Sequence, residues 1–277
     1  MTYYSPTKLG LALEIAAQPF GKIIAGGTDV YPAAKRGISP KFFLDLTRLD
    51  GFAEITEHEG LHRIGAATTW SQIAKFDLPP AFDALKQTAK EVGSVQIQNT
   101  GTIAGNICNA SPAADGIPSL LALDAKVELA SAARGTRVLA LSEFIQGVRK
   151  TALAEDELMT AILIPPVPVG AGSAFEKLGS RRYLVISISM VAAVITCDDE
   201  RRIVDARVAV GSCSPVAQRL PELEHDIIGK KVQEIKLTER HFAPLSPIDD
   251  VRGSRLYRLD VVAEQCVRAI KRATRHE

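Results

Sequence analysis

Hydrophobic residues recur along the chain with two spacings, and each spacing predicts short elements. Residues 7–17 carry apolar side chains at helical spacing and predict a helix, which capping residues at 5–7 open. Apolar runs at 22–27 and 41–49 predict two strands, and the first run ends in a Gly-Gly turn. The first fifty residues are therefore expected to mix helix and strand.

The region from 52 to 93 predicts a hairpin followed by two helices. The hairpin is expected to turn at Glu59 and Gly60, and the first helix to start at about Thr69. The second helix, in 79–93, begins with proline and is followed by glycine, which is the usual asymmetry of helix ends.

Residues 94–123 have a different character, with few charges and many Gly, Asn, Ser and Thr residues. We expect a long loop there, and long loops inside compact domains are usually functional. Beyond it, 125–131 and 136–145 alternate like paired strands.

The segment 162–175 contains three prolines and two glycines, a composition typical of a linker. It divides the chain into two predicted α+β units, 1–168 and 169–277. The second unit is expected to contain two long strands and a final helix, at 183–197, 202–213 and 256–274.

Composition narrows the class of protein. Of the 277 residues, 46% are hydrophobic and 23% charged, as in soluble globular proteins, and the formal net charge of +1 gives no reason to expect nucleic acid or an anionic membrane as partner. No apolar run is long enough for a membrane span, and the first residues do not resemble a secretory signal. The scattered cysteines predict buried free thiols and a cytoplasmic location; they are Cys108, Cys197, Cys213 and Cys266.

Two segments match familiar functional motifs wholly or in part, but the residues around each segment do not fit the motif. The segment "HEGLH" at 58–62 matches a zinc-protease pattern, but that pattern needs a helix, and here a glycine lies in its middle between strand-like flanks. The segment 170–175 lacks the third glycine of a dinucleotide fingerprint and follows prolines instead of a strand. We predict no metal site and no catalytic acid or base, which favours either a borrowed cofactor or no catalysis.

Two glycine-rich stretches, 25–29 and 100–106, are the best candidates for a binding site. Glycines allow consecutive N–H groups to point into one concavity, which attracts an anion such as pyrophosphate. Thr28, Thr102 and Asn106 can add side-chain hydrogen bonds to phosphate or ribitol oxygens. One Gly-Gly turn alone is more often structural, but the two stretches together predict an anion or nucleotide site.

Two charged residues lie where they could complete such a site. Asp115, among small residues, is suited to accept a hydrogen bond from a ring N–H, although an aspartate before a glycine can also simply shape a turn. Lys177 follows the linker, so it can reach a ligand held between the two units.

Four segments together closely resemble the flavin-binding subunit of molybdenum hydroxylases, the family of xanthine dehydrogenase and the carbon monoxide dehydrogenase medium chain. They are 25–30, 64–73, 92–129 and 247–258, and the motif "TIAGNICNASPAAD" in the third is the most specific. The resemblance extends from about Ser5 to the final helix. It implies an FAD-binding domain of the vanillyl-alcohol-oxidase (PCMH) type over 1–168, and a smaller α/β domain of the CO dehydrogenase flavoprotein C-terminal type over 169–277.

The resemblance also implies which residues bind FAD. The first glycine loop wraps the pyrophosphate with backbone amides, so its two glycines are expected to be bare to let phosphate approach. The second loop holds the diphosphate and ribityl side, while an aspartate and a lysine reach the flavin ring and an apolar pair packs near the cofactor. The implied set is Ile24, Ala25, Gly26, Gly27, Thr28, Asp29, Gly101, Thr102, Gly105, Asn106, Cys108, Asp115, Leu158, Met159 and Lys177.

Three departures from the family pattern affect this expectation. Ala104 replaces a glycine in the second loop, and Gln98 replaces an arginine beside it. The residues at 183–186, Tyr183 first among them, differ from those that follow "SRR" in many members, so the ring-side contacts are left open. The chain has no cysteine-rich insertion, so no iron–sulfur cluster is expected on it.

The function implied by the resemblance is that of an electron-transfer flavoprotein subunit. A large partner subunit would carry molybdopterin and hydroxylate the substrate, and a small partner would relay electrons through [2Fe-2S] clusters to FAD on this chain. The family implies a heterotrimer that dimerises. Two alternatives are a stand-alone flavin-dependent oxidoreductase and an assembly subunit without FAD. The sequence indicates neither the substrate nor the electron acceptor, which could be NAD⁺, a quinone or O₂.

Overall fold

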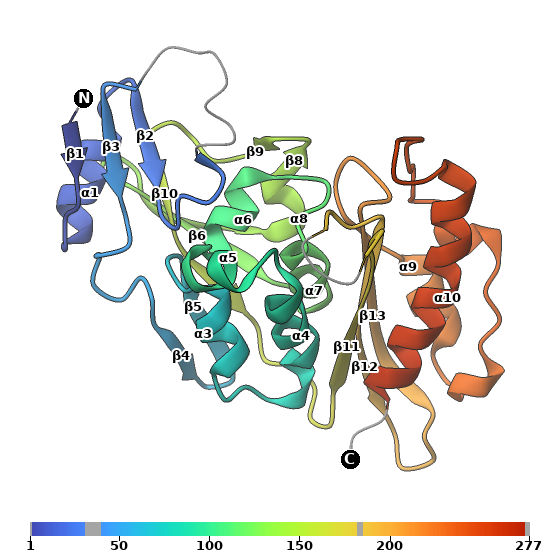
Figure 1. Ribbon diagram of the computed structural model, residues 1–277. Helices are drawn as coiled ribbons and strands as arrows, with labels where there is room; N and C mark the ends of the chain where they lie inside the picture. The colour runs from blue at the N-terminus through green and yellow to red at the C-terminus, as the bar shows by residue number, and fades with distance from the viewer. Residues whose placement is uncertain (1, 31–39, 182–184, 275–277) are drawn as a thin grey trace.

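The computed structural model describes residues 2–30, 40–181 and 185–274 (Figure 1). Their strands form four sheets, of three, five, two and four strands. Helices accompany the sheets along the whole described chain, which confirms the expected α+β class. No helix in these residues is long and apolar enough to cross a bilayer.

The first sheet is parallel and has the order β1-β3-β2. Its elements are β1 (Thr2–Tyr4), β2 (Gly21–Ile24) and β3 (Phe42–Asp45), and α1 (Leu9–Ala16) connects β1 to β2. The expectation that residues 5–7 cap the helix is wrong: the N-cap is Lys8, in extended conformation and without a side-chain cap. Residues 5–7 instead lead the chain out of β1, a strand that the sequence pattern did not reveal.

The second sheet is antiparallel and has the order β4-β5-β10-β6-β7. Its strands are β4 (Ile55–His58), β5 (Leu61–Gly65), β6 (Lys126–Ser131), β7 (Gly135–Ala140) and β10 (Glu157–Ile164). The hairpin turn at Glu59 and Gly60 is confirmed, and both residues have positive φ, of 52° and 79°. His58 and His62 therefore lie on two strands, not on the single helix that a zinc protease requires.

The two helices expected in 69–93 are present. α3 (Trp70–Lys75) starts with a capping box between Thr69 and Gln72. α4 (Asp83–Glu91) follows a 3-10 turn, η1 (Pro80–Phe82), and ends before Gly93, whose φ is +53°.

The prediction of a long loop at 94–123 is wrong, because this region forms α5 (Val95–Thr100), α6 (Ile103–Asn109) and α7 (Gly116–Ala122). Hydroxyl caps stabilise the first two: Ser94 Oγ accepts from the Ile97 N–H at 3.3 Å, and Thr102 Oγ1 from the Gly105 N–H at 3.1 Å. All residues of α7 are buried, so it has no polar face. Short capped helices without amphipathic spacing resemble a loop in the sequence.

A small two-stranded sheet follows β7. The expected strand at 136–145 ends at Ala140, after which the chain forms α8 (Leu141–Phe144), β8 (Ile145–Gly147) and β9 (Lys150–Thr151). Without the alternation of a long strand, these residues turn back toward α6 (Figure 1).

The second half of the chain forms an antiparallel sheet, β11-β12-β13-β14. Its strands are β11 (Gly172–Leu178), β12 (Ser189–Cys197), β13 (Ile203–Gly211) and β14 (Gln218–Arg219). The linker is shorter than expected, since only 165–171 separate β10 from β11. β12 also begins later than position 183, and residues 182–184 lie outside the described residues.

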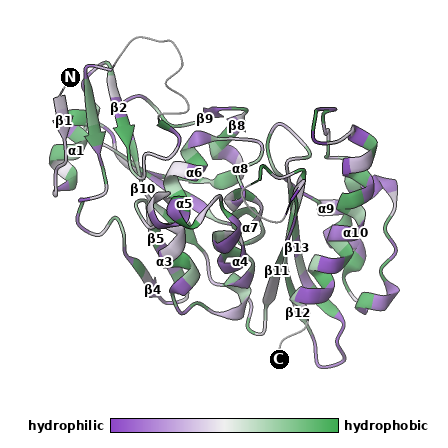
Figure 2. Cartoon of the chain, viewed as in Figure 1, coloured by the Kyte–Doolittle hydropathy of each residue, from purple (hydrophilic) through white to green (hydrophobic). Residues whose placement is uncertain are grey.

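Helices on both sides cover this sheet (Figure 1). α10 (Arg255–Ala273) and α9 (Pro221–Ile227) pack on one face, and α4 and α7 of the first half pack on the other. The remaining short turns are η2 (Val232–Glu234) and η3 (Glu239–Phe242). α10 shows green and purple faces in Figure 2, as expected for an amphipathic helix whose buried residues contact a sheet.

The hydrophobic core continues from one half of the chain into the other. Alternate residues of β12 belong to different core clusters: Met190, Ala192 and Val194 join the core of the first half, while Val191 and Ala193 face α9 and α10. This alternation follows from the two-residue repeat of a strand that is buried on both faces. The domain boundary at residue 168 stays a prediction.

Candidate functional site

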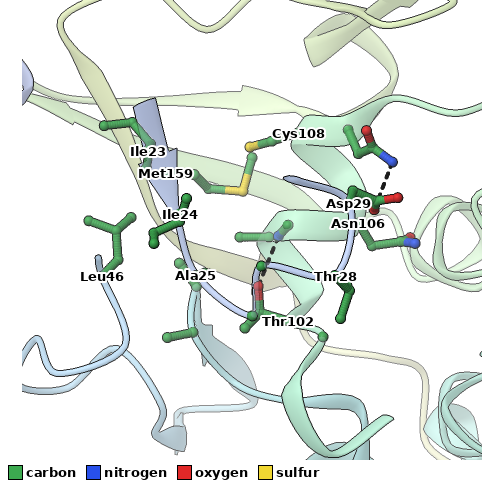
Figure 3. A pocket seen from close by; sticks show the side chains of 18 of the residues that line it. Ile23, Ile24, Ala25, Thr28, Asp29, Leu46, Thr102, Asn106, Cys108 and Met159 are labelled. Atoms are coloured by element: carbon green, nitrogen blue, oxygen red, sulfur yellow. Dashed lines mark hydrogen bonds between the residues drawn. The ribbon is translucent and has the colours of Figure 1, made fainter. Parts of the chain in front are cut away.

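A cavity of about 300 Å³ lies where the loop after β2 meets the start of α6 (Figure 3). Residues 22–30 and 101–109 form most of its lining, and the start of β10 at Glu157–Met159 completes one wall. The two glycine-rich stretches that the sequence singled out are therefore brought together at one cavity.

The first stretch needs its two glycines for different reasons. A Cβ on Gly26 would lie only 1.9 Å from the Thr100 carbonyl oxygen, so this residue must lack a side chain for the two stretches to touch. Gly27 has a φ of +69° and open space around it, so its backbone conformation requires glycine. Contact between the two loops is therefore one reason for glycine at position 26, and the direct approach of a phosphate stays a prediction.

This first stretch presents several backbone N–H groups without partners. No carbonyl within the described residues accepts a backbone hydrogen bond from Gly26, Gly27, Thr28 or Asp29, and the only such bond that closes the turn runs from Val30 to Gly27 at 3.1 Å. Consecutive unpaired N–H groups beside a cavity form the concavity that binds phosphate oxygens.

The second stretch adds polar groups to the same cavity. Thr102 begins α6, and its hydroxyl is engaged by the Gly105 N–H. Asn106 Oδ1 is buried and has no hydrogen-bond partner in the described residues. This oxygen lies against α7, 2.9 Å from the position that a Cβ on Gly116 would take, so it does not face the open cavity. Ala104, the departure from the family glycine, is buried in α6 and lines the cavity without blocking it.

The opposite wall of the cavity is apolar. Ile24, Leu158 and Met159 line it, together with the partly exposed residue Cys108 (Figure 3). Burial raises the pKa of the Cys108 thiol to about 12, so this side chain is a neutral packing group at physiological pH. Of the four free cysteines, only Cys213 and Cys266 are buried, and the expectation of burial is wrong for the other two. An apolar wall opposite a row of N–H groups is suited to a ligand with a flat ring and a phosphate.

Asp115 and Lys177 lie outside the lining of this cavity and contact each other. Lys177 Nζ donates to Asp115 Oδ2 at 2.7 Å and to the Glu91 carbonyl at 3.0 Å, and Ser187 Oγ donates to Asp115 Oδ1 at 2.6 Å. Burial raises the pKa of Asp115, and the ammonium of Lys177 opposes this effect. The pair joins α7 to β11, and the ring contacts expected of both residues stay predictions.

Several lining residues were not expected from the sequence. Leu46, Trp70, Asn109, Leu153 and Glu157 all line the cavity. Asn109 lies inside the quoted motif and Trp70 inside the resembling segment 64–73, but Leu46, Leu153 and Glu157 lie outside every segment that the sequence singled out for binding or for its resemblance to the family. The ring-side contacts left open around Tyr183 lie outside the described residues.

Comparison with known proteins decides the family. The model described as the FAD binding domain in molybdopterin dehydrogenase matches residues 1–167. The chain belongs to the molybdopterin dehydrogenase FAD-binding family. A second model, the CO dehydrogenase flavoprotein C-terminal domain, matches residues 173–273. These matches confirm the resemblance seen in the sequence.

Relatives of this FAD-binding family member include the nicotinate dehydrogenase FAD-subunit of Eubacterium barkeri, 38% identical over 64% of this chain and 61% of that protein. The 6-hydroxypseudooxynicotine dehydrogenase complex subunit alpha of Paenarthrobacter nicotinovorans is 31% identical over 91% of this chain and 86% of its own. A chain in the structure of reconstituted CO dehydrogenase from Oligotropha carboxidovorans matches with a TM-score of 0.90 and 26% identity, covering 99% of this chain and 97% of that one.

The cavity fits the cofactor of the family. The N–H groups of Gly26, Gly27, Thr28 and Asp29, which have no backbone partner among the described residues, are suited to a diphosphate. The apolar wall that includes Leu158 and Met159 is suited to a ring. Among the described residues, no group of three His, Cys, Asp or Glu side chains is placed to hold a metal ion.

Proposed function

We propose that this chain is the FAD-carrying electron-transfer subunit of a molybdenum-containing hydroxylase or dehydrogenase complex. The observation that carries the proposal is the cavity itself, where the two loops of an FAD-binding family meet with unpaired N–H groups. Relatives named as FAD or medium subunits of dehydrogenases support the same role.

In this proposal the chain's own residues bind and orient the cofactor. The N–H groups of residues 26–29 hold the diphosphate, and the second loop holds the diphosphate and ribityl side with Gly101, Thr102, Gly105, Asn106 and Cys108. The apolar wall, which includes Leu158, would hold the flavin ring. Bound FAD supplies the ability to exchange electrons singly or in pairs. No side chain of this protein acts as general acid or base.

The wider assembly is also part of the proposal. A molybdopterin-containing large subunit and a small [2Fe-2S] subunit associate with this chain in a heterotrimer that dimerises, in the cytoplasm. Names such as "medium chain" and "complex subunit" among the relatives support partner subunits. The large subunit then determines the substrate, and this chain passes the electrons to an external acceptor.

Titration of the FAD-free chain with FAD tests cofactor binding, with Thr102→Ala compared with Thr69→Ala. Each variant removes a helix N-cap, but only Thr102 lines the cavity. We expect wild-type protein and Thr69→Ala to bind FAD, and Thr102→Ala to bind at least about tenfold more weakly, the loss of one charge-assisted hydrogen bond. Equal loss in both variants, or no FAD binding by the wild type, contradicts the proposal.

Co-expression with the neighbouring genes tests the role in a complex. A tag on this chain alone should recover yellow protein, absorbing near about 450 nm as flavins do, with molybdenum and iron in companion subunits. Yellow protein without partners would point to a stand-alone flavin enzyme. Colourless protein that cannot be reconstituted with FAD would leave only an assembly role.

A further inference from the structure

The hairpin of β8 and β9 contacts the end of α6 that lies beside the cavity. Gly147 pairs with Lys150, so the turn consists of Val148 and Arg149. Arg149 has a φ of +57°, a left-handed conformation that side chains other than glycine rarely adopt. Positive φ is usual in a two-residue hairpin turn, and further contacts hold this arginine in place.

Those contacts are hydrogen bonds to the last residues of α6. The Arg149 N–H donates to the Ala110 carbonyl at 2.8 Å, and Arg149 Nη1 donates to the Asn109 carbonyl at 3.1 Å. Arg149 Nη1 also donates to Asn109 Oδ1. Arg149 therefore satisfies carbonyls at the C-terminal end of a helix, where a cation is favoured.

The same arginine determines which way the Asn109 amide faces. A guanidinium can only donate hydrogen bonds, so the amide must present its oxygen to Arg149. Its NH2 group then faces the opposite direction, where Asn109 Nδ2 donates to Asp29 Oδ2 at 2.9 Å. If the amide rotated by half a turn, its oxygen would face the Asp29 carboxylate, which would be repulsive.

Asp29 is the last residue of the row of unpaired N–H groups in the first loop. Its carboxylate is a negative charge beside groups that are to receive an anion, so an unpartnered Asp29 would oppose binding. The Asn109 amide neutralises part of that charge by donating to it, and the bond also ties the loop to α6. Arg149 itself does not line the cavity.

We propose that Arg149 is a positioning residue for the cofactor. By fixing the orientation of the Asn109 amide, it holds Asp29, and with it the N–H groups of residues 26–29, in the arrangement that receives the diphosphate. This inference rests on the proposed function. It adds a residue that is outside the cavity, 40 positions from Asn109 in sequence.

The test compares Arg149→Met, Arg149→Lys and Asn109→Ala with the control Arg268→Met. Arg268 is an exposed arginine with one ion pair on α10, to Glu264. The first measurement is the FAD dissociation constant, from flavin fluorescence. We expect Arg149→Met to bind FAD about tenfold more weakly than the control, equivalent to one hydrogen bond to a charged group. Lysine can still donate to Asn109 Oδ1, so Arg149→Lys should recover part of the loss.

The second measurement is hydrogen exchange of the Val30 N–H in FAD-free protein, the N–H whose bond to the Gly27 carbonyl at 3.1 Å closes the loop; it does not depend on the cofactor. We expect faster exchange there in Arg149→Met and Asn109→Ala, and wild-type exchange in Arg268→Met. In the double variant, adding Arg149→Met to Asn109→Ala should weaken FAD binding by less than a further twofold. The reason is that the arginine acts through the Asn109 amide, which is already absent.

Two results would overturn the inference. One is an FAD dissociation constant of Arg149→Met within twofold of that of the control. The other is that Arg149→Met weakens FAD binding by the same factor in the wild-type background and in the Asn109→Ala background. If the wild type itself fails to bind FAD, the proposed function fails instead. Hydrogen exchange then still decides whether Arg149 holds the loop.

Discussion

The contact between the two glycine-rich stretches makes a sharp prediction for alanine at positions 26 and 27. A methyl group on Gly26 would lie 1.9 Å from the Thr100 carbonyl oxygen and 2.8 Å from Gly101 Cα, whereas real Cβ contacts are essentially never below 3.0 Å. Gly26→Ala must therefore separate the loops by about 1 Å. Gly27→Ala meets no atom and has only its φ of +69° as a cost.

The expected losses of affinity follow from this difference. Separating the loops by about 1 Å stretches or breaks several hydrogen bonds to the diphosphate, each worth roughly 1.5–3 kcal/mol. Gly26→Ala should therefore bind FAD at least about 100-fold more weakly, which is about 2.7 kcal/mol. A left-handed alanine costs roughly 1–2 kcal/mol, so Gly27→Ala should lose about 5- to 30-fold in affinity if that strain appears only on binding.

Fluorescence titration of FAD-free protein measures both affinities. Urea unfolding of the same samples checks that each variant is folded and shows where the strain of Gly27→Ala appears. Equal losses in the two variants, or a larger loss for Gly27→Ala, would refute the account of the loop contact.

Three further outcomes follow from charges and burial. Lys177→Met should lower the free energy of unfolding by about 3–5 kcal/mol, because it leaves Asp115 buried with one partner, and adding Asp115→Asn should recover most of the loss in urea unfolding. Arg137 holds the pKa of Glu157 below its ordinary 4.5. The stabilisation of the fold by this ion pair is therefore complete above pH 4.5 and is lost as the pH falls through the lower folded-state pKa. Glu157→Gln should flatten this acid dependence of the urea midpoint. With a pKa of about 12, Cys108 should react with iodoacetamide on the order of a thousandfold more slowly than a free thiol at pH 8, so its rapid labelling, seen by mass spectrometry, would contradict its raised pKa.

Local chemistry explains which elements could be predicted from the sequence. The turn at Glu59 and the cap at Thr69 depend on residues within four positions, so their signals are complete in the sequence. β1 is stabilised by parallel pairing with β3, about 40 residues away, and three residues carry no periodicity that would reveal it. α7 is buried on every side, so the apolar stripe that marks a surface helix is missing.

The features of the candidate site are likewise predictable from the sequence only where their causes are local. Its two glycine-rich stretches stand out in the sequence because glycine, threonine and asparagine gather there without charges. The need for glycine at position 26 is not visible in the sequence, because the atom that excludes a side chain there belongs to Thr100. Arg149 was missed for the same cause: its partner Asn109 is 40 residues away, and Asp29 is 80 residues from that asparagine.

The two-sided burial of β12 limits how the protein can move. Met190, Ala192 and Val194 pack with the first half of the chain although they belong to the sheet of the second. Swinging one half away about residues 165–171 would expose these side chains to water, so that segment is no hinge. The two family segments should instead melt as one cooperative unit, and a protein cut at residue 168 should yield two pieces that aggregate. The distance between the cavity and the C-terminal sheet is then fixed by packing and not by the length of the linker.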